Sequence, residues 1–472
     1  MPPHKMIYHA CGLIVFLWLA AAVATAQHNF FLSDEVAATN AVTNTPEVLT
    51  NSIPEQVTNH APAQIAPGSE NAAGVTEADP ALEKLRALNA IIWEEGDLWR
   101  QDAAALAAKL GLVPEGTPGK TVSTFRSYGG QAVDFDGVTP ATTSLVGDPE
   151  RVTELGFVFI NQGDFFGDLT GSPDRQNILS SKEREFRKQM DDEENRLKAF
   201  ISTALGAEPR TALVGTGHLR EKVHRWDMGE TSLLLAVLPE RYVALRIWPK
   251  SLADSNGRPV RITATELKER LKDNVVKRDN GDVTIENIPM INQGPKGYCV
   301  PATYERLLRY VGLSADMYAL ANSGGTRAGG GTVVEDMNRA VDGLLSRAGR
   351  RVQGSLPMTF SEISRWIDRG VPLIWTMFVT PDIENQSNEF TRQRQSESFD
   401  EWKKAMRRYQ TPVGFQANRS GAHVRMIVGY NKDTQEIAYS DSWGPEFQER
   451  WMPFEAAKAV TPTTGGLQAI TW

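Results

Sequence analysis

The stretch Gln293-Gly-Pro-Lys-Gly-Tyr-Cys299-Val-Pro-Ala302 is the most informative segment of the sequence, and it holds the only cysteine after residue 26. Glycine and proline predict a loop over 293–297, and the apolar spacing that follows predicts a helix over 298–311. Cys299 then lies in the first turn, where unpaired N–H groups and the helix dipole favour a thiolate over a thiol. Gln293, six residues earlier, would donate a hydrogen bond beside the Cys299 N–H and stabilise an oxyanion.

A histidine and an aspartate far downstream supply the other parts of a thiol-based site. His423 begins an apolar segment, 423–430, that predicts a strand, and a turn leads to a second strand at 436–440. This hairpin would bring Asp441 level with His423, where a carboxylate fixes the tautomer and orientation of an imidazole. Trp443 would cover the pair and keep water out. Alone, the glutamine, the histidine or the aspartate is more typical of a structural role, but the four residues in this order indicate nucleophilic catalysis.

These residues resemble papain-like cysteine peptidases, and most closely the bacterial branch similar to bacteriocin-processing (double-glycine) peptidases. Gln-x5-Cys resembles that family's oxyanion glutamine and nucleophile, and Cys299-Val-Pro-Ala302 is similar to the branch's Cys-Gly-Pro-Ala. His423 through Gly429-Tyr430 resembles the His-x5-Gly-Tyr of papain relatives, and Asp441-Ser-Trp-Gly444 resembles their Asn-Ser-Trp-Gly.

The resemblance implies a role for each residue: Cys299 as nucleophile, His423 as general base and acid, Asp441 as orienting carboxylate and Gln293 as oxyanion donor. It also implies a papain-like α+β domain at 282–472, with a helical lobe, an antiparallel sheet and 372–378 as the central strand. No metal or organic cofactor is implied. Two departures, Val300 after the cysteine and a long polar stretch over 381–418, leave the substrate open.

The rest of the chain predicts a leader, a linker and a second domain. Residues 1–26 read as a secretory signal with cleavage after Ala26, so we expect a secreted or periplasmic protein. Residues 27–78 have the composition of a disordered linker. Residues 79–250 predict a separate N-terminal α+β domain of unknown role, with a strand at 157–160, a helix over 181–205 and a hairpin over 232–248. Residues 251–281, with a charged helix around 264–272, are expected to link the two domains.

Composition limits the partners. Without the leader, 49 basic residues stand against 58 acidic ones, a net charge of -9. Nucleic acid and anionic membrane surfaces reward clustered positive charge, so neither is an expected partner. No second apolar segment is long enough to cross a membrane. His218 and His224 lack a third ligand at metal-binding spacing. The sequence leaves the oligomeric state open.

The leading hypothesis is a secreted cysteine peptidase that cleaves peptide bonds in peptide or protein substrates through a thioester acyl-enzyme. The same residues would also serve a papain-fold cell-wall amidase or a transglutaminase-type acyl transferase. A catalytically inactive binding protein is a third hypothesis. The N-terminal domain could be a binding module, an anchor or an inhibitory prodomain. An inhibitory prodomain predicts that segment 282–472 alone is more active than the longer chain.

Overall fold

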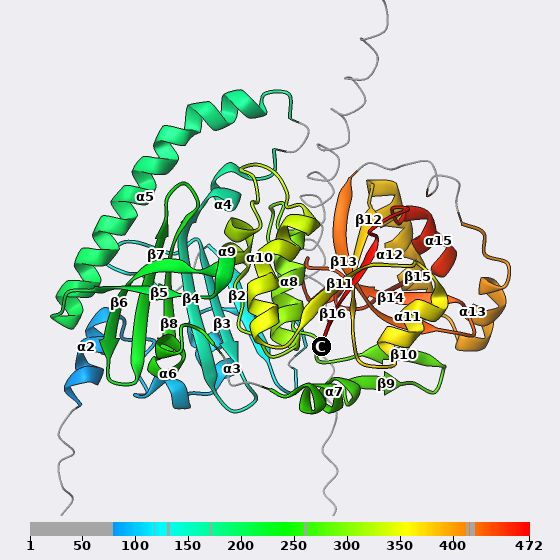
Figure 1. The fold of residues 1–472 in the computed structure, drawn as a ribbon, viewed down its shortest axis with the longest axis horizontal. Coiled ribbons are helices and arrows are strands. Elements are labelled where there is room, and N and C mark those ends of the chain that lie inside the picture. The colour runs from blue at the N-terminus through cyan, green and yellow to red at the C-terminus, as the bar shows by residue number, and fades with distance from the viewer. Residues whose placement is uncertain are drawn as a thin grey trace, which may run out of the picture.

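The computed structural model describes residues 79–472, apart from 118, 130–132, 170–171, 259–261, 412–414 and 416–420. The expected leader (1–26) and disordered linker (27–78) lie outside the described residues. The described chain forms two antiparallel sheets with helices between and around them (Figure 1). The predicted α+β fold class, with a separate N-terminal domain, is therefore confirmed.

The N-terminal domain is built on an eight-stranded sheet in the order β1-β2-β3-β4-β8-β7-β6-β5. Its strands are β1 (Val113–Pro114), β2 (Ser123–Tyr128), β3 (Thr142–Gly147), β4 (Val152–Asn161), β5 (Arg210–Val214), β6 (Glu221–Met228), β7 (Thr231–Leu238) and β8 (Tyr242–Pro249). Its helices are α2 (Pro80–Leu88), α3 (Ala103–Lys109), α4 (Gln162–Phe166), α5 (Arg175–Leu205) and α6 (Lys250–Asp254). The predicted hairpin is present as β7 and β8, which pair antiparallel along their full length.

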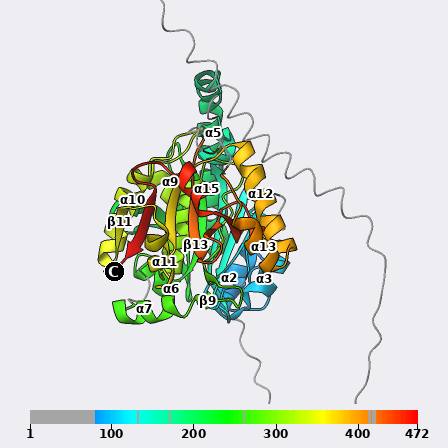
Figure 2. The same ribbon diagram turned by 90° about the vertical axis from the view of Figure 1, so that its right-hand side faces the viewer.

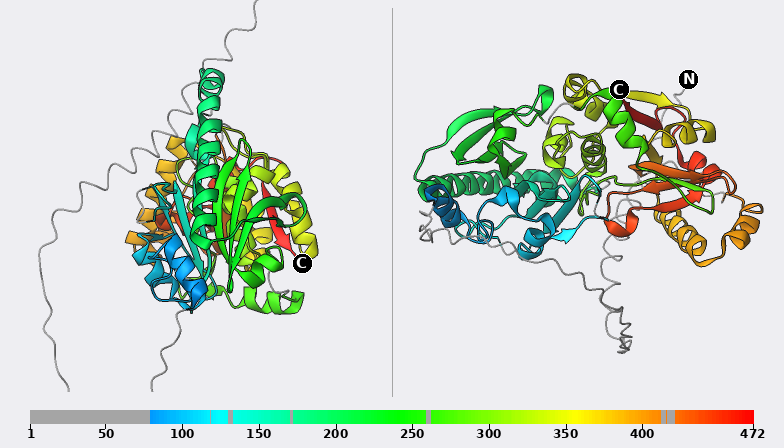
Figure 3. Two further views of the ribbon diagram at one scale, coloured as in Figure 1. Left: turned by 90° about the vertical axis from the view of Figure 1, so that its left-hand side faces the viewer. Right: turned by 90° about the horizontal axis from the view of Figure 1, so that it is seen from below.

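Strand β7 is buried on both faces over most of its length, which explains its unbroken apolar run. Leu233 and Leu235 pack in a core with α2, α3 and the long helix α5, which runs along the outer side of the sheet (Figure 3). The alternate residues Leu234 and Ala236 pack against the other domain, in a cluster that includes Ala302. A strand with only one buried face would alternate apolar and polar residues. The sequence of segment 232–237 therefore indicates that this strand is covered on both faces, and the second face contacts the C-terminal domain.

The C-terminal domain has a second sheet, ordered β11-β16-β12-β13-β10-β9, from which β14 and β15 extend beside β13. Its strands are β9 (Val275–Lys277), β10 (Asp282–Ile285), β11 (Arg351–Leu356), β12 (Leu373–Phe378), β13 (Ala422–Asn431), β14 (Glu436–Ser440), β15 (Arg450–Pro453) and β16 (Leu467–Thr471). Its helices are α7 (Ala264–Lys272), α8 (Cys299–Tyr310), α9 (Met317–Ser323), α10 (Val334–Arg347), α11 (Phe360–Ile367), α12 (Pro381–Ser396), α13 (Phe399–Met406) and α15 (Phe454–Val460).

Helices α8, α9 and α10 lie between the two sheets (Figure 1). On the far side of the C-terminal sheet, α12 and α13 lie within the long polar stretch over 381–418 (Figure 2). The segment expected to link the domains, 251–281, contains α7 and β9; Leu267 and Leu271 of α7 are buried in the C-terminal core. No helix within the described residues is long and apolar enough to cross a bilayer.

Candidate active site

Cys299 is the first residue of α8, as the sequence predicts, and the helix begins without a side-chain cap. Its thiol is free and partly exposed. The first-turn N–H groups of α8 have no intrahelical partners, so they and the helix dipole face any negative charge that forms there. The position suits a nucleophilic thiolate.

His423 lies near the start of β13 and joins Cys299 to Asp441. Its Nε2 is 2.8 Å from Oδ1 of Asp441, and its ring is also hydrogen bonded to the Cys299 thiol. Because Nε2 is engaged by the carboxylate, Nδ1 is the ring atom left for the sulfur. The indole of Trp443 covers the imidazole at a centroid distance of 4.8 Å, as expected. The structure thus brings the three residues into one hydrogen-bonded row.

The electrostatics of the row favour an imidazolium. Burial works to lower the pKa of His423, but the negative charges of Asp441 and Cys299, with hydrogen bonds to both, raise it to about 9. Burial works in the opposite sense on Asp441, yet attraction to His423 and to two arginines holds the pKa of this carboxyl well below its usual range. Both shifts favour an ionised Asp441 beside a protonated His423.

Two arginines and a glutamate around Asp441 complete a buried charge network that the sequence analysis missed. Oδ2 of Asp441 accepts from Arg425 Nε at 2.6 Å and from Arg450 Nη2 at 3.1 Å. Both guanidinium groups also pair with Glu384 of α12. The carboxylates of Asp441 and Glu384 balance the guanidinium groups of Arg425 and Arg450. The inserted helix α12 thus contributes directly to the site.

A buried arginine of α8 links the nucleophile helix to the strand that carries the carboxylate. Arg306 Nη1 donates to the backbone oxygen of Asp441 at 2.9 Å, and its Nη2 donates to Ser440 Oγ at 2.6 Å. Its Nε donates to the oxygen of Pro289, in the loop before Gln293. Burial lowers the pKa of Arg306 to about 9, against the attraction of Asp441. One side chain therefore sets the spacing of three catalytic segments.

Gln293 is buried in the loop between β10 and α8 and is tied to the residue after Asp441. Its backbone N–H donates to the oxygen of Ser442 at 2.8 Å, and its Oε1 accepts from Ser442 Oγ at 2.7 Å. Its Nε2 donates to the backbone oxygen of Lys296 at 2.8 Å, which uses one of its two N–H groups. All four predicted residues thus lie where the α8 loop meets the β13–β14 hairpin.

Only one of the missed residues had a signal in the sequence. Arg425 is a charge inside an otherwise apolar strand, two residues after His423 and so on the same face of it. Glu384 and Arg450 have no comparable signal in the sequence, because α12 and β15 approach Asp441 only in the folded structure. Within the described parts of the chain, no group of histidine, cysteine and acidic side chains could hold a metal ion.

Part of the chain is similar to a known family of proteins. Residues 285–463 match the model of the Peptidase_C39 like family, so the predicted resemblance is confirmed at this level. A solved chain from Bacillus anthracis, described as a "putative C39-like peptidase", shares 15% identity; the match covers 40% of this chain and 96% of that one, with a TM-score of 0.26. A TM-score this low carries no argument. No curated protein matches the chain.

Proposed function

We propose that this protein is an exported cysteine peptidase in which Cys299, His423 and Asp441 act as a catalytic triad. One observation carries the proposal: a thiol at a helix N-terminus is hydrogen bonded to an imidazole whose other nitrogen is held by a buried, ionised carboxylate. The family of the C-terminal domain supports a peptide substrate. Export rests on the leader-like residues 1–26 alone.

Acylation starts from the thiolate–imidazolium pair. The sulfur of Cys299 adds to the scissile carbonyl carbon, a C–S bond forms, and the π electrons of the C=O bond move to oxygen. The Cys299 N–H and the free N–H of the Gln293 amide stabilise this oxyanion. His423 then gives its proton to the amide nitrogen as the C–N bond breaks, which releases the amine and leaves a thioester.

Deacylation reverses these roles. His423, now neutral, takes a proton from water while the water oxygen attacks the thioester. The C–S bond breaks, and the thiolate is restored beside the imidazolium. Asp441 keeps Nε2 protonated throughout, so Nδ1 is the atom that exchanges the proton.

The test is hydrolysis by the chain without its leader, compared with its Cys299→Ala variant. We expect cleavage of peptides by the parent and none by the variant, with unchanged circular dichroism and melting temperature. Mass spectrometry of products from peptides, from peptidoglycan and from peptides with an amine acceptor separates a peptidase from a cell-wall amidase or a transferase. Equal turnover by parent and variant refutes the proposal.

A further inference from the structure

The N-terminal domain contacts the loop before Cys299 through one face of strand β2. Thr124 Oγ1 donates to the backbone oxygen of Met290 at 2.6 Å, and the hydroxyl of Tyr128 donates to the backbone oxygen of Asn292 at 2.5 Å. These two strand residues are four apart, so their side chains leave the same face of the sheet. The strand therefore holds the loop backbone directly.

An ion pair between these two positions adds a third contact on the same face. Arg126 Nε donates to Glu115 Oε1 at 2.7 Å, and both side chains are almost fully buried. The same carboxylate oxygen accepts from the backbone N–H of Asn292 at 2.7 Å. Both polar groups of the Asn292 backbone thus have partners in the N-terminal domain.

Lys296, between Gln293 and Cys299, inserts its ammonium group into a cage shared by the two domains. Nζ lies 2.5 Å from Asp164 Oδ1 and 3.2 Å from the hydroxyl of Tyr318. The rings of Tyr128, Tyr298 and Tyr318 surround it at 4.6, 5.4 and 5.0 Å. Burial lowers the pKa of Lys296, and the charge of Asp164 opposes that shift. Tyr128 and Asp164 come from the N-terminal domain.

The caged lysine also orients the oxyanion donor. The backbone oxygen of Lys296 is the acceptor for Gln293 Nε2, so the position of this peptide sets the direction of the amide. The intervening Gly294 has a φ of +69°, and a Cβ there would lie 2.9 Å from the Tyr128 ring. Only glycine allows the loop to turn this closely against the N-terminal domain.

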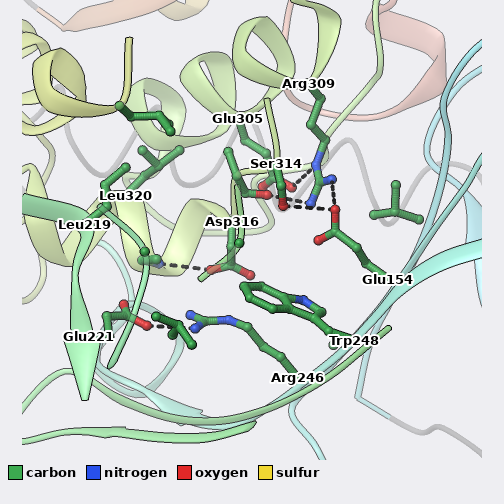
Figure 4. A pocket seen from close by; sticks show the side chains of 18 of the residues that line it. Glu154, Leu219, Glu221, Arg246, Trp248, Glu305, Arg309, Ser314, Asp316 and Leu320 are labelled. Carbon is green, nitrogen blue, oxygen red and sulfur yellow. Dashed lines mark hydrogen bonds and ion pairs between the residues drawn. The ribbon is translucent and has the colours of Figure 1, made fainter. Parts of the chain in front are cut away.

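The N-terminal domain also contacts the C-terminal end of α8. Arg309 Nη1 pairs with Glu154 of β4 at 3.0 Å, and Ser314 donates to the same carboxylate at 2.9 Å. These residues line a cavity between the domains, where Arg309 also pairs with Glu305 (Figure 4). Helix α8, which begins with the nucleophile, is therefore held by the N-terminal domain at both ends.

We propose that the N-terminal domain is a fixed part of the catalytic unit, in which strand β2 and Asp164 hold Lys296, and Lys296 holds the Gln293 amide in position. Lys296 is a positioning residue, since it acts through Gln293. This inference rests on the proposed function. It excludes a prodomain that is removed to release activity, because removal would take away the contacts that Thr124, Tyr128, Glu115 and Asp164 make with the loop.

The test compares Lys296→Met with the parent, both without the leader and with the N-terminal domain present. Methionine is also unbranched, is one heavy atom shorter than lysine and carries no charge. Asp164 is partly exposed, so water can solvate its carboxylate. We expect kcat for peptide hydrolysis and affinity for a peptide aldehyde to fall about 100-fold, since both need a placed oxyanion donor. KM and the rate of Cys299 alkylation by iodoacetamide, which forms no oxyanion, are expected to stay the same.

Two further variants separate positioning from loss of stability. Tyr128→Phe keeps the ring over Lys296 but removes the bond to Asn292, and it is expected to lower kcat less than Lys296→Met. Leu233→Ala destabilises the N-terminal core far from the loop and is expected to keep the parent kcat and aldehyde affinity at a temperature where it is folded.

The outcomes distinguish the inference from the function on which it rests. Equal aldehyde affinity in Lys296→Met and parent overturns the inference and leaves the proposed function standing, and so does an equal loss in Leu233→Ala. A parent chain that neither hydrolyses peptides nor binds the aldehyde overturns the proposed function, and the inference with it.

Discussion

Replacing Asp441 with asparagine tests the electrostatics of the site, because it removes the charge beside His423 and nearly keeps the shape of the side chain. In the parent, the pKa of His423 is about 9, against an ordinary value of 6.5. The difference of about 2.5 pKa units corresponds to about 3 kcal/mol in favour of the imidazolium. Burial works to lower the pKa of His423, so without the carboxylate charge only Cys299 opposes it. We expect the pKa of His423 in Asp441→Asn to fall to the ordinary range or below.

The measurement is an NMR titration of protein labelled in its histidine rings, with the His423 signal assigned by its absence in His423→Gln. Asp433→Asn is the matched control, because Asp433 is an exposed carboxylate in the turn of the same hairpin. We expect the control to titrate like the parent. A parent midpoint near 6.5, or the same midpoint in parent and Asp441→Asn, would refute the reasoning.

Three further predictions concern stability and the N-terminal domain. Glu384→Gln removes one of the negative charges that pair with the buried Arg425 and Arg450, so the free energy of unfolding measured in urea should fall by about 3 kcal/mol. Glu389→Gln, at an exposed position on the same helix, is the control and should change the free energy of unfolding little. An equal loss in both variants would contradict a stabilising role for the charge network. Since folding raises the pKa of His423, its contribution to the unfolding free energy is complete below about pH 6.5 and is lost as pH rises through about 9. The free energy of unfolding of the parent should therefore fall more than that of Asp441→Asn between about pH 6.5 and 9. Parallel plots of unfolding free energy against pH for the two proteins would contradict this prediction. Segment 282–472 alone exposes the apolar faces of α8 and α9, so we expect it to be less active than the longer chain; higher activity favours a prodomain.

Local patterns predicted the elements of this fold well. The helix expected around 264–272 is α7, the helix expected over 181–205 lies within α5, and the predicted hairpins are β7–β8 and β13–β14. In each case the apolar spacing reflects contacts of the element's own buried face. The boundaries expected for the two domains remain predictions.

The site was predictable in part, for a different reason. Cys299 and Gln293 lie within one loop and its helix, and His423 and Asp441 on one hairpin, so short-range geometry constrains each pair. Arg450, which pairs with Asp441, comes from β15, and Glu384, which pairs with Arg450, comes from α12. Two of the partners of Lys296, Tyr128 and Asp164, come from β2 and α4. Such contacts depend on how distant elements pack, which no local pattern in one sequence encodes.

The most direct test of the central claim is the mass of the acid-quenched protein during reaction with an activated peptide ester. A thioester adds the acyl mass to the chain, and peptide mapping locates it. We expect a single acyl adduct on Cys299 that is absent from Cys299→Ser and forms more slowly in Gln293→Ala. No adduct in the parent, or an adduct on another residue, would contradict the central claim.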